Sequence, residues 1–189
     1  MEKNFEKQQN HTKWLHSAKE CAYLAVFVAL LIAMQLVLSA LPGVELVTVM
    51  FVAYSYVMGV KRGMLAATAF SLLRQAVFGV FPKVFVLYII YFNLLALCFG
   101  LLGHNNKNMK IWFPILIIIA CIATACFTML DNVITPIWLG YTQRDARLYF
   151  KASLPFMIPQ IVCTALTVTF LFLPLRKVFK MLKKSLQIR

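Results

Sequence analysis

The sequence predicts an all-α polytopic membrane protein, a single domain (residues 1–189) with six transmembrane helices and both chain ends in the cytoplasm. The first observation is composition: 62% of the 189 residues are hydrophobic and only 13% are charged. Soluble domains are roughly half apolar and a quarter charged. The second observation is a series of six apolar runs, most of them close to the 20 or so residues that cross a bilayer. The third is the placement of the basic residues.

The six apolar runs follow one another with short breaks. They comprise residues 21–41, 44–60, 64–81, 84–102, 111–130 and 152–173. Pro42-Gly43 ends the first run, and a turn at Lys61-Arg62-Gly63 is expected between the second and the third. The longest connection, residues 135–145, is expected to be a loop that caps the outer end of the bundle as a lid. Residues 1–20 form a flank before the first helix, and residues 174–189 form a basic tail.

Lys and Arg residues set the predicted orientation. Most of the 19 basic residues lie in segments that an even number of spans places on one side: 3–19, 61–62, 107–110 and 176–189. The opposite side has Lys83, Arg144, Arg147 and Lys151. Because cytoplasmic segments are enriched in Lys and Arg, both termini are predicted inside the cell membrane. Topology and attraction of the tail to anionic lipid thus explain the net charge of +13, and no nucleic-acid partner is expected.

The sequence gives little indication of catalysis. Its five cysteines all lie in apolar runs, and its three histidines lie in polar flanks, so no metal site is expected. Asp131 has no second aspartate within a run, and no histidine is available there, which argues against an intramembrane protease. The chain also has no Gly-x-x-x-x-Gly-Lys-Ser/Thr phosphate loop. We therefore expect no enzymatic activity and no cofactor in this chain.

Polar residues within the runs concentrate at one predicted depth. Counting 1.5 Å per residue places them from the middle of the membrane to its outer face, and the inner halves of the helices have almost none. Polar groups inside a membrane mark water-filled cavities and substrate paths. The candidate substrate-binding residues are Glu45, Arg74, Gln75, Asn93, Asp131 and Asn132.

Each of these residues also has a structural interpretation. Glu45 either accepts hydrogen bonds from a substrate or is a carboxylate stabilised at the N-terminus of its helix. Arg74 either binds a substrate carboxylate or phosphate, or forms an ion pair with Asp131 or Glu45. The amides either contact a ligand or form hydrogen bonds between helices. The structural alternative for Asp131 is a cap at the outer end of the fifth helix.

The first helix has a stripe of small residues. Ala18, Ala22, Ala25, Ala29 and Ala33 fall within about 80° of one another at 100° per residue. Small residues at this spacing allow a second helix to approach closely in a membrane. The stripe is therefore a candidate docking surface for a partner.

Size, topology and two motifs resemble one known family. Pro42-Gly43-Val44-Glu45-Leu46-Val47-Thr48 is similar to the segment that follows the first helix in several members, and Ala18/Ala22 with Ala25/Ala29 resembles the Ala-x-x-x-Ala docking motif of their first helix. The whole chain resembles the substrate-binding (S) components of energy-coupling factor (ECF) transporters, a type of ABC transporter for vitamins and other micronutrients.

The resemblance implies a function and partners. An S component binds a vitamin-like small molecule at the outer face and docks on one transmembrane coupling protein and two ATPase subunits, which hydrolyse ATP. Because the substrate residues of the family vary with the vitamin, none is transferred to this chain by motif. The alternative function is a stand-alone channel for small solutes or a secondary transporter or exporter, in which polar residues are expected through the full depth of the membrane.

Overall fold

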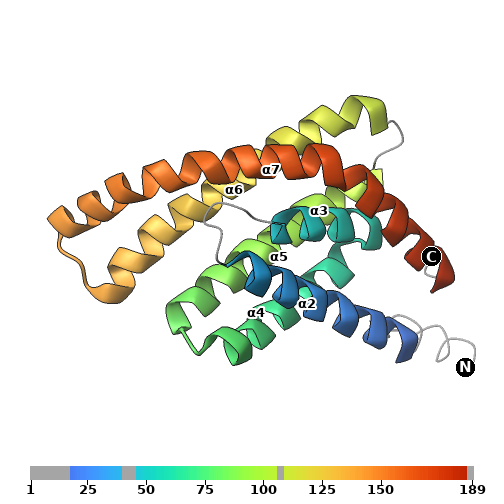
Figure 1. Ribbon diagram of the computed structural model, residues 1–189, viewed down its shortest axis with the longest axis horizontal. Coiled ribbons are helices and arrows are strands. Elements are labelled where there is room, and N and C mark those ends of the chain that lie inside the picture. Colours follow the sequence, from blue (N-terminus) through green and yellow to red (C-terminus); the bar gives the residue numbers. More distant parts are fainter. Residues whose placement is uncertain (1–17, 40–45, 106–108, 187–189) are drawn as a thin grey trace, which may run out of the picture.

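The computed structural model describes residues 18–39, 46–105 and 109–186, and this part of the chain is helical without strands (Figure 1). The helices are α2 (Ala18–Leu38), α3 (Val47–Met58), α4 (Val60–Phe78), α5 (Pro82–Asn105), α6 (Met109–Leu139) and α7 (Gln143–Ser185). Each helix corresponds to one of the six apolar runs. The all-α fold class is confirmed.

Four of these helices are long and apolar enough to cross a membrane: α2, α5, α6 and α7. Helix α3 has 12 residues, a length of about 18 Å, against a hydrocarbon core of about 30 Å. Helix α4 has 19 residues but contains Lys61, Arg62 and Arg74. The structure thus has the features of a membrane-embedded protein, with four candidate spans and a shorter apolar helix where the sequence predicted six spans.

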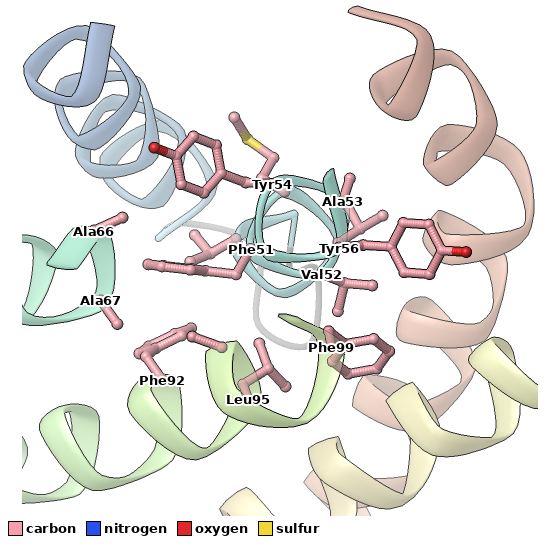
Figure 2. Close-up of a cluster of buried hydrophobic side chains, with 14 of the residues drawn as sticks. Phe51, Val52, Ala53, Tyr54, Tyr56, Ala66, Ala67, Phe92, Leu95 and Phe99 are labelled. Atoms are coloured by element: carbon pink, nitrogen blue, oxygen red, sulfur yellow. The ribbon is translucent and has the colours of Figure 1, made fainter. Parts of the chain in front are cut away.

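Helix α3 is the centre of the bundle. All of its 12 residues are buried, and Figure 2 shows side chains of α3 directed to several neighbours, with Tyr54 on the side of α2 and Tyr56 on the side of α7. The Phe51 ring lies 4.6 Å from the Phe92 ring of α5 and 5.5 Å from the Phe70 ring of α4. A helix that is apolar on every side is typical of a protein interior, which explains why a run of 12 residues suffices here.

Gly59 separates α3 from α4. Its φ of 87° and ψ of 173° lie in a region that is essentially restricted to glycine. The chain changes direction at this single residue, and Lys61-Arg62-Gly63 lies in the first turn of α4. The predicted turn at Lys61-Arg62-Gly63 is therefore wrong by two residues, because the glycine with positive φ rather than the charged pair ends α3.

The backbone of α5 packs directly against the backbone of the chain where α3 meets α4. A Cβ atom placed on Gly103 would lie 2.0 Å from the carbonyl oxygen of Tyr56, and one placed on Gly100 would lie 2.6 Å from the backbone nitrogen of Val60. Only glycine allows this approach. The two glycines thus determine how closely α5 packs against the central helix.

The predicted loop at residues 135–145 is wrong. Helix α6 continues to Leu139 and α7 begins at Gln143, so the connection is only Gly140-Tyr141-Thr142. The side chain of Thr142 accepts a hydrogen bond from the backbone N–H of Asp145 and caps α7. Pro136 lies inside α6 and did not end it, because prolines are tolerated within membrane helices.

The α6–α7 hairpin extends past the turn between α4 and α5, at the left in Figure 1; we call this side of the molecule the hairpin end. The start of α2 and the end of α7 lie at the opposite side. The predicted tail continues α7 to Ser185. There, Lys183 Nζ donates a hydrogen bond to the carbonyl oxygen of Val57 at 3.2 Å. A cation is favourable at this point because the carbonyl groups of the last turn of α3 carry partial negative charge.

Candidate ligand-binding site

Arg74 is held by side chains of three helices at the hairpin end. Its Nε donates a hydrogen bond to Oε1 of Gln35 on α2 at 3.0 Å. The Nε2 of Gln35 donates in turn to the hydroxyl of Tyr88 on α5 at 2.7 Å. The guanidinium carbon lies 4.4 Å from the centroid of the Tyr88 ring and 4.7 Å from that of Phe78, one turn along α4. Gln35, Arg74, Phe78 and Tyr88 form what we call the Arg74 cluster.

One nitrogen of Arg74 is unpaired within the described residues. Its Nη1 is buried and makes no hydrogen bond with the part of the chain that the structure describes. A buried donor left unpaired costs about 1–3 kcal/mol, and more when the group is charged. The remaining bonds hold the guanidinium group in one orientation, with a free donor suited to a carboxylate or phosphate oxygen.

Gln75 holds the turn between α4 and α5. Its Oε1 accepts a hydrogen bond from the backbone N–H of Phe81 at 3.0 Å, and its Nε2 is buried without a partner in the described residues. The side chain thus satisfies a backbone donor in the residues that connect the two helices. This contact fits a structural role for Gln75, although its amide nitrogen is still available as a hydrogen-bond donor to a ligand.

Asp131 lies in a second cluster, formed by α5, α6 and α7. Its Oδ2 accepts a hydrogen bond from the Tyr149 hydroxyl at 2.5 Å, and its Oδ1 accepts one from Thr135 Oγ1 at 2.8 Å. Lys83 Nζ lies 3.8 Å from the same Oδ1. Lys83, Asp131, Thr135 and Tyr149 form what we call the Asp131 cluster. Lys83 rather than Arg74 is therefore the cation beside Asp131. Asp131 also lies two turns before the end of α6, so it does not cap that end.

A pocket of about 340 Å³ opens beside the Asp131 cluster, between α6 and α7. Its walls combine hydroxyl, amide and carboxylate groups with aromatic and thioether side chains. The lining residues are Phe127, Thr128, Asp131, Tyr149, Ala152, Ser153, Phe156, Met157 and Gln160. At its edge, Asn132 Nδ2 donates to the Ser153 hydroxyl at 2.8 Å, while Asn132 Oδ1 is buried without a partner among the described residues.

Asn93 uses both ends of its amide for helix packing. Its Nδ2 donates to the backbone carbonyl of Ile89 at 2.7 Å, and its Oδ1 accepts from Thr68 Oγ1 of α4 at 3.4 Å. These contacts fit a hydrogen bond between helices rather than a ligand contact. Glu45, the first residue of the predicted site, lies outside the described residues.

The two clusters lie on either side of an aromatic layer rather than in one cavity. The Tyr88 ring of the Arg74 cluster lies 5.9 Å from the ring of Phe127, which lines the pocket beside Asp131. Phe127 also contacts Tyr91, with ring centroids 4.7 Å apart. The predicted site is therefore divided into an Arg74 part and an Asp131 part.

Sequence reasoning missed several members of the two clusters. Gln35, Lys83, Tyr88 and Tyr149 are absent from the predicted site residues. Gln35 had one usable signal, since it is the single amide in the second half of the first run, where Ser39 is the other polar residue. Polar residues inside a membrane run mark a candidate site, so the criterion that selected Arg74 also applies to Gln35.

The alanine stripe of α2 faces away from the rest of the protein. Ala18, Ala22, Ala25 and Ala29 are exposed, whereas Phe27, Val28 and Leu31 on the other side of the helix are buried. The small residues are therefore not needed for packing within the chain. This leaves a smooth helix surface along the first three turns of α2.

Within the described ranges, no three His, Cys, Asp or Glu side chains lie close enough together to hold a metal ion. Comparison of the chain with protein-family models, with curated proteins and with solved structures finds no match.

Proposed function

We propose that this protein is the substrate-capture subunit of an ATP-driven micronutrient importer, of the type represented by the S components of ECF transporters. It binds a vitamin-like small molecule with an anionic group and has no catalytic activity of its own. In this proposal the hairpin end faces outward, both termini lie in the cytoplasm, and the six helices together form the membrane domain of a plasma-membrane protein.

The observation that supports this function best is the unpaired Nη1 of Arg74. The guanidinium group is oriented by Gln35, Tyr88 and Phe78, and yet one of its donors is buried without an acceptor in the described part of the chain. A binding site prepared in advance loses little entropy when its ligand arrives. A carboxylate or phosphate of the substrate supplies the missing acceptor and compensates the buried charge.

The neighbouring groups fit the rest of such a ligand. The Tyr88 and Phe78 rings flank the cation with apolar surface, and Gln75 Nε2 is a second buried donor without a partner among the described residues. The Arg74 cation, the two rings and the amide of Gln75 together favour a small anionic molecule with a polar ring.

Docking on a partner is proposed for the exposed alanine stripe. A transmembrane helix of the coupling protein packs against Ala18, Ala22, Ala25 and Ala29, because small side chains allow close contact of backbones. The coupling protein is joined by two ATPase subunits that hydrolyse ATP. The ligand site and the docking stripe then lie on different faces of α2, because Gln35 is about 80–140° around the helix from the four alanines at 100° per residue.

The test is mass spectrometry of the proteins and small molecules that co-purify with the tagged protein from its native membrane in mild detergent. The wild-type chain is expected to retain a coupling protein, two ATPases and an anionic small molecule. Arg74→Met is expected to lose the small molecule and keep the proteins, and Ala25→Leu is expected to do the reverse. Arg62→Gln, which removes an ion pair with Glu20 at the opposite end of the molecule, is the control for a lost arginine.

Two results would contradict the proposal. A wild-type chain that purifies with neither proteins nor a small molecule would favour the channel or exporter. Retention of the small molecule by Arg74→Met would show that the ligand is held elsewhere.

A further inference from the structure

A second surface lies at the tip of the α6–α7 hairpin, on the exposed side chains beyond the Asp131 cluster. We use the name hairpin tip for residues 137–151, which comprise the last turn of α6, the three-residue connection and the first turns of α7. Figure 1 shows that this tip extends beyond the other helices. Its side chains divide into a basic set and an apolar set, and most of both are exposed.

The basic set forms one face of α7. Arg144, Arg147 and Lys151 are exposed and fall within about 60° of one another at 100° per residue. The described residues provide no ion pair for any of the three. The nearest carboxylates along the chain are already engaged: Asp145 accepts a hydrogen bond from the Thr142 hydroxyl at 2.6 Å, and Asp131 is bound within its own cluster.

The apolar set is too large to be left in water. Ile137 is 76% exposed, Trp138 52% and Leu148 58%, and Leu139 and Tyr141 are exposed beside them. Trp and Tyr gather at the boundary between lipid tails and headgroups, where one part of the ring is apolar and another is wet. The exposed apolar side chains therefore indicate contact with a membrane rather than projection into solvent.

Helix length places the tip at the same boundary. Helix α7 has 43 residues, or about 65 Å, roughly twice the hydrocarbon thickness of a bilayer. Its apolar stretch, residues 152–173, is about 33 Å long and accounts for the crossing. Lys151 then lies at the edge of the hydrocarbon, and Arg144 lies about 10 Å further out, at the level of the lipid phosphates.

We propose that the hairpin tip is a binding surface for anionic phospholipid. The basic face of α7 binds lipid phosphate groups, and Trp138 with its apolar neighbours inserts among the upper parts of the acyl chains. Basic residues combined with an apolar edge are the features by which helices bind to anionic membrane surfaces. This proposal depends only on membrane embedding and stands apart from the transport function.

The experiment uses Trp138 as a local probe. The full chain, with Trp14→Phe and Trp112→Phe, is reconstituted into bilayers in which part of the lipid carries bromine on its acyl chains and quenches nearby tryptophan fluorescence. Brominated phosphatidylglycerol, which is anionic, is compared with brominated phosphatidylcholine, which is zwitterionic. Their relative quenching gives the preference of the tip for anionic lipid.

We expect about a fivefold preference for phosphatidylglycerol per basic side chain that contacts a headgroup, reduced by 0.5 M salt. Arg144→Gln, Arg147→Gln and Lys151→Gln together should remove it. The matched control combines Lys177→Gln, Lys180→Gln and Lys184→Gln, which has the same spacing and charge change at the other end of α7, and should keep it. Because all six side chains are exposed, both variants should fold, as the unaltered Trp138 emission in unbrominated lipid would show.

Three results would overturn the proposal. Equal quenching by the two lipids in the starting protein would mean that the tip does not select anionic headgroups. A preference that survives the triple change in the tip would assign it to other residues. Absence of quenching by either lipid would place Trp138 in water or beneath another protein.

Discussion

Replacing Arg74 by methionine separates a ligand-binding role from a structural one. Methionine keeps an unbranched side chain of similar reach beside the Phe78 and Tyr88 rings, but it removes the charge. The change also leaves Gln35 Oε1 without its donor, while the bond from Gln35 to Tyr88 remains possible. The free energy of unfolding and the affinity for the anionic ligand should respond very differently.

The effect on stability is the difference of opposing terms. The charged hydrogen bond to Gln35 is worth about 1.5–3 kcal/mol, and each of the two ring contacts about 0.5–2 kcal/mol. Against this, the unpaired Nη1 costs about 1–3 kcal/mol in the unliganded protein, and the substitution removes that cost. Since methionine also keeps part of the two ring contacts, the ligand-free variant should lose only about 2 kcal/mol of unfolding free energy.

The effect on binding should be larger. Removing one member of a buried charge pair costs about 2–5 kcal/mol of binding free energy, which is a loss of roughly 30-fold to several thousand-fold in affinity. Gln35→Met keeps the charge but releases the guanidinium group, and an intermediate loss is expected. The measurements are the binding isotherm of the co-purified small molecule and the thermal unfolding of both variants without ligand.

A large loss of stability with unchanged affinity would refute this reasoning. It would mean that Arg74 holds α2, α4 and α5 together and that its free nitrogen has no ligand. A double-mutant cycle of Arg74→Met and Gln35→Met then measures how much of the stability is shared by the pair.

Three further predictions test the fold and the docking surface. Gly103→Ala should destabilise the protein severely, since the new methyl group would lie 2.0 Å from the Tyr56 carbonyl oxygen. The control Gly140→Ala has no atom within 4 Å and only an unfavourable φ of 63°, and it should cost about 1 kcal/mol. Comparable losses of stability in thermal unfolding would contradict the observed packing of α5. Ala25→Leu should abolish uptake and leave ligand affinity unchanged, and parallel loss of both would show that the two surfaces are not separate. Lys183→Met should lower the free energy of unfolding by about 1 kcal/mol, because the cation at the last turn of α3 is lost; unchanged unfolding would remove that role.

The number and order of the helices could be predicted from the sequence because each helix follows an apolar run. The depth of α3 could not, since an apolar stretch has the same composition whether lipid or protein surrounds it. Its burial depends on the close approach of α5 at Gly100 and Gly103, and such a contact between distant segments leaves no local pattern. The continuation of α6 through Pro136 was missed for a related reason: a proline ends a helix in water more readily than in a membrane.

The positions of the candidate site residues along their helices could be read from the sequence, but the partners of these residues could not. Arg74 and Asp131 both lie toward the hairpin end, as their positions in the runs indicated. Which cation stands beside Asp131 depends on which helices are neighbours, and Lys83 reaches it because α5 and α6 are adjacent there. Hydrogen-bond partners become predictable only after the arrangement of the helices is known.

Helix α2 relates the two proposed surfaces to each other. Gln35 near its end orients Arg74, and the exposed alanines occupy the first turns of the same helix. Since a helix of 21 residues moves largely as one body, a shift of Gln35 caused by ligand binding to Arg74 would also displace the docking stripe. A partner can respond to the ligand only if it binds the two positions of α2 with different affinity. By reciprocity, docking would then change ligand affinity by the same factor. This is the requirement for an importer that must hold its substrate when free and release it when docked.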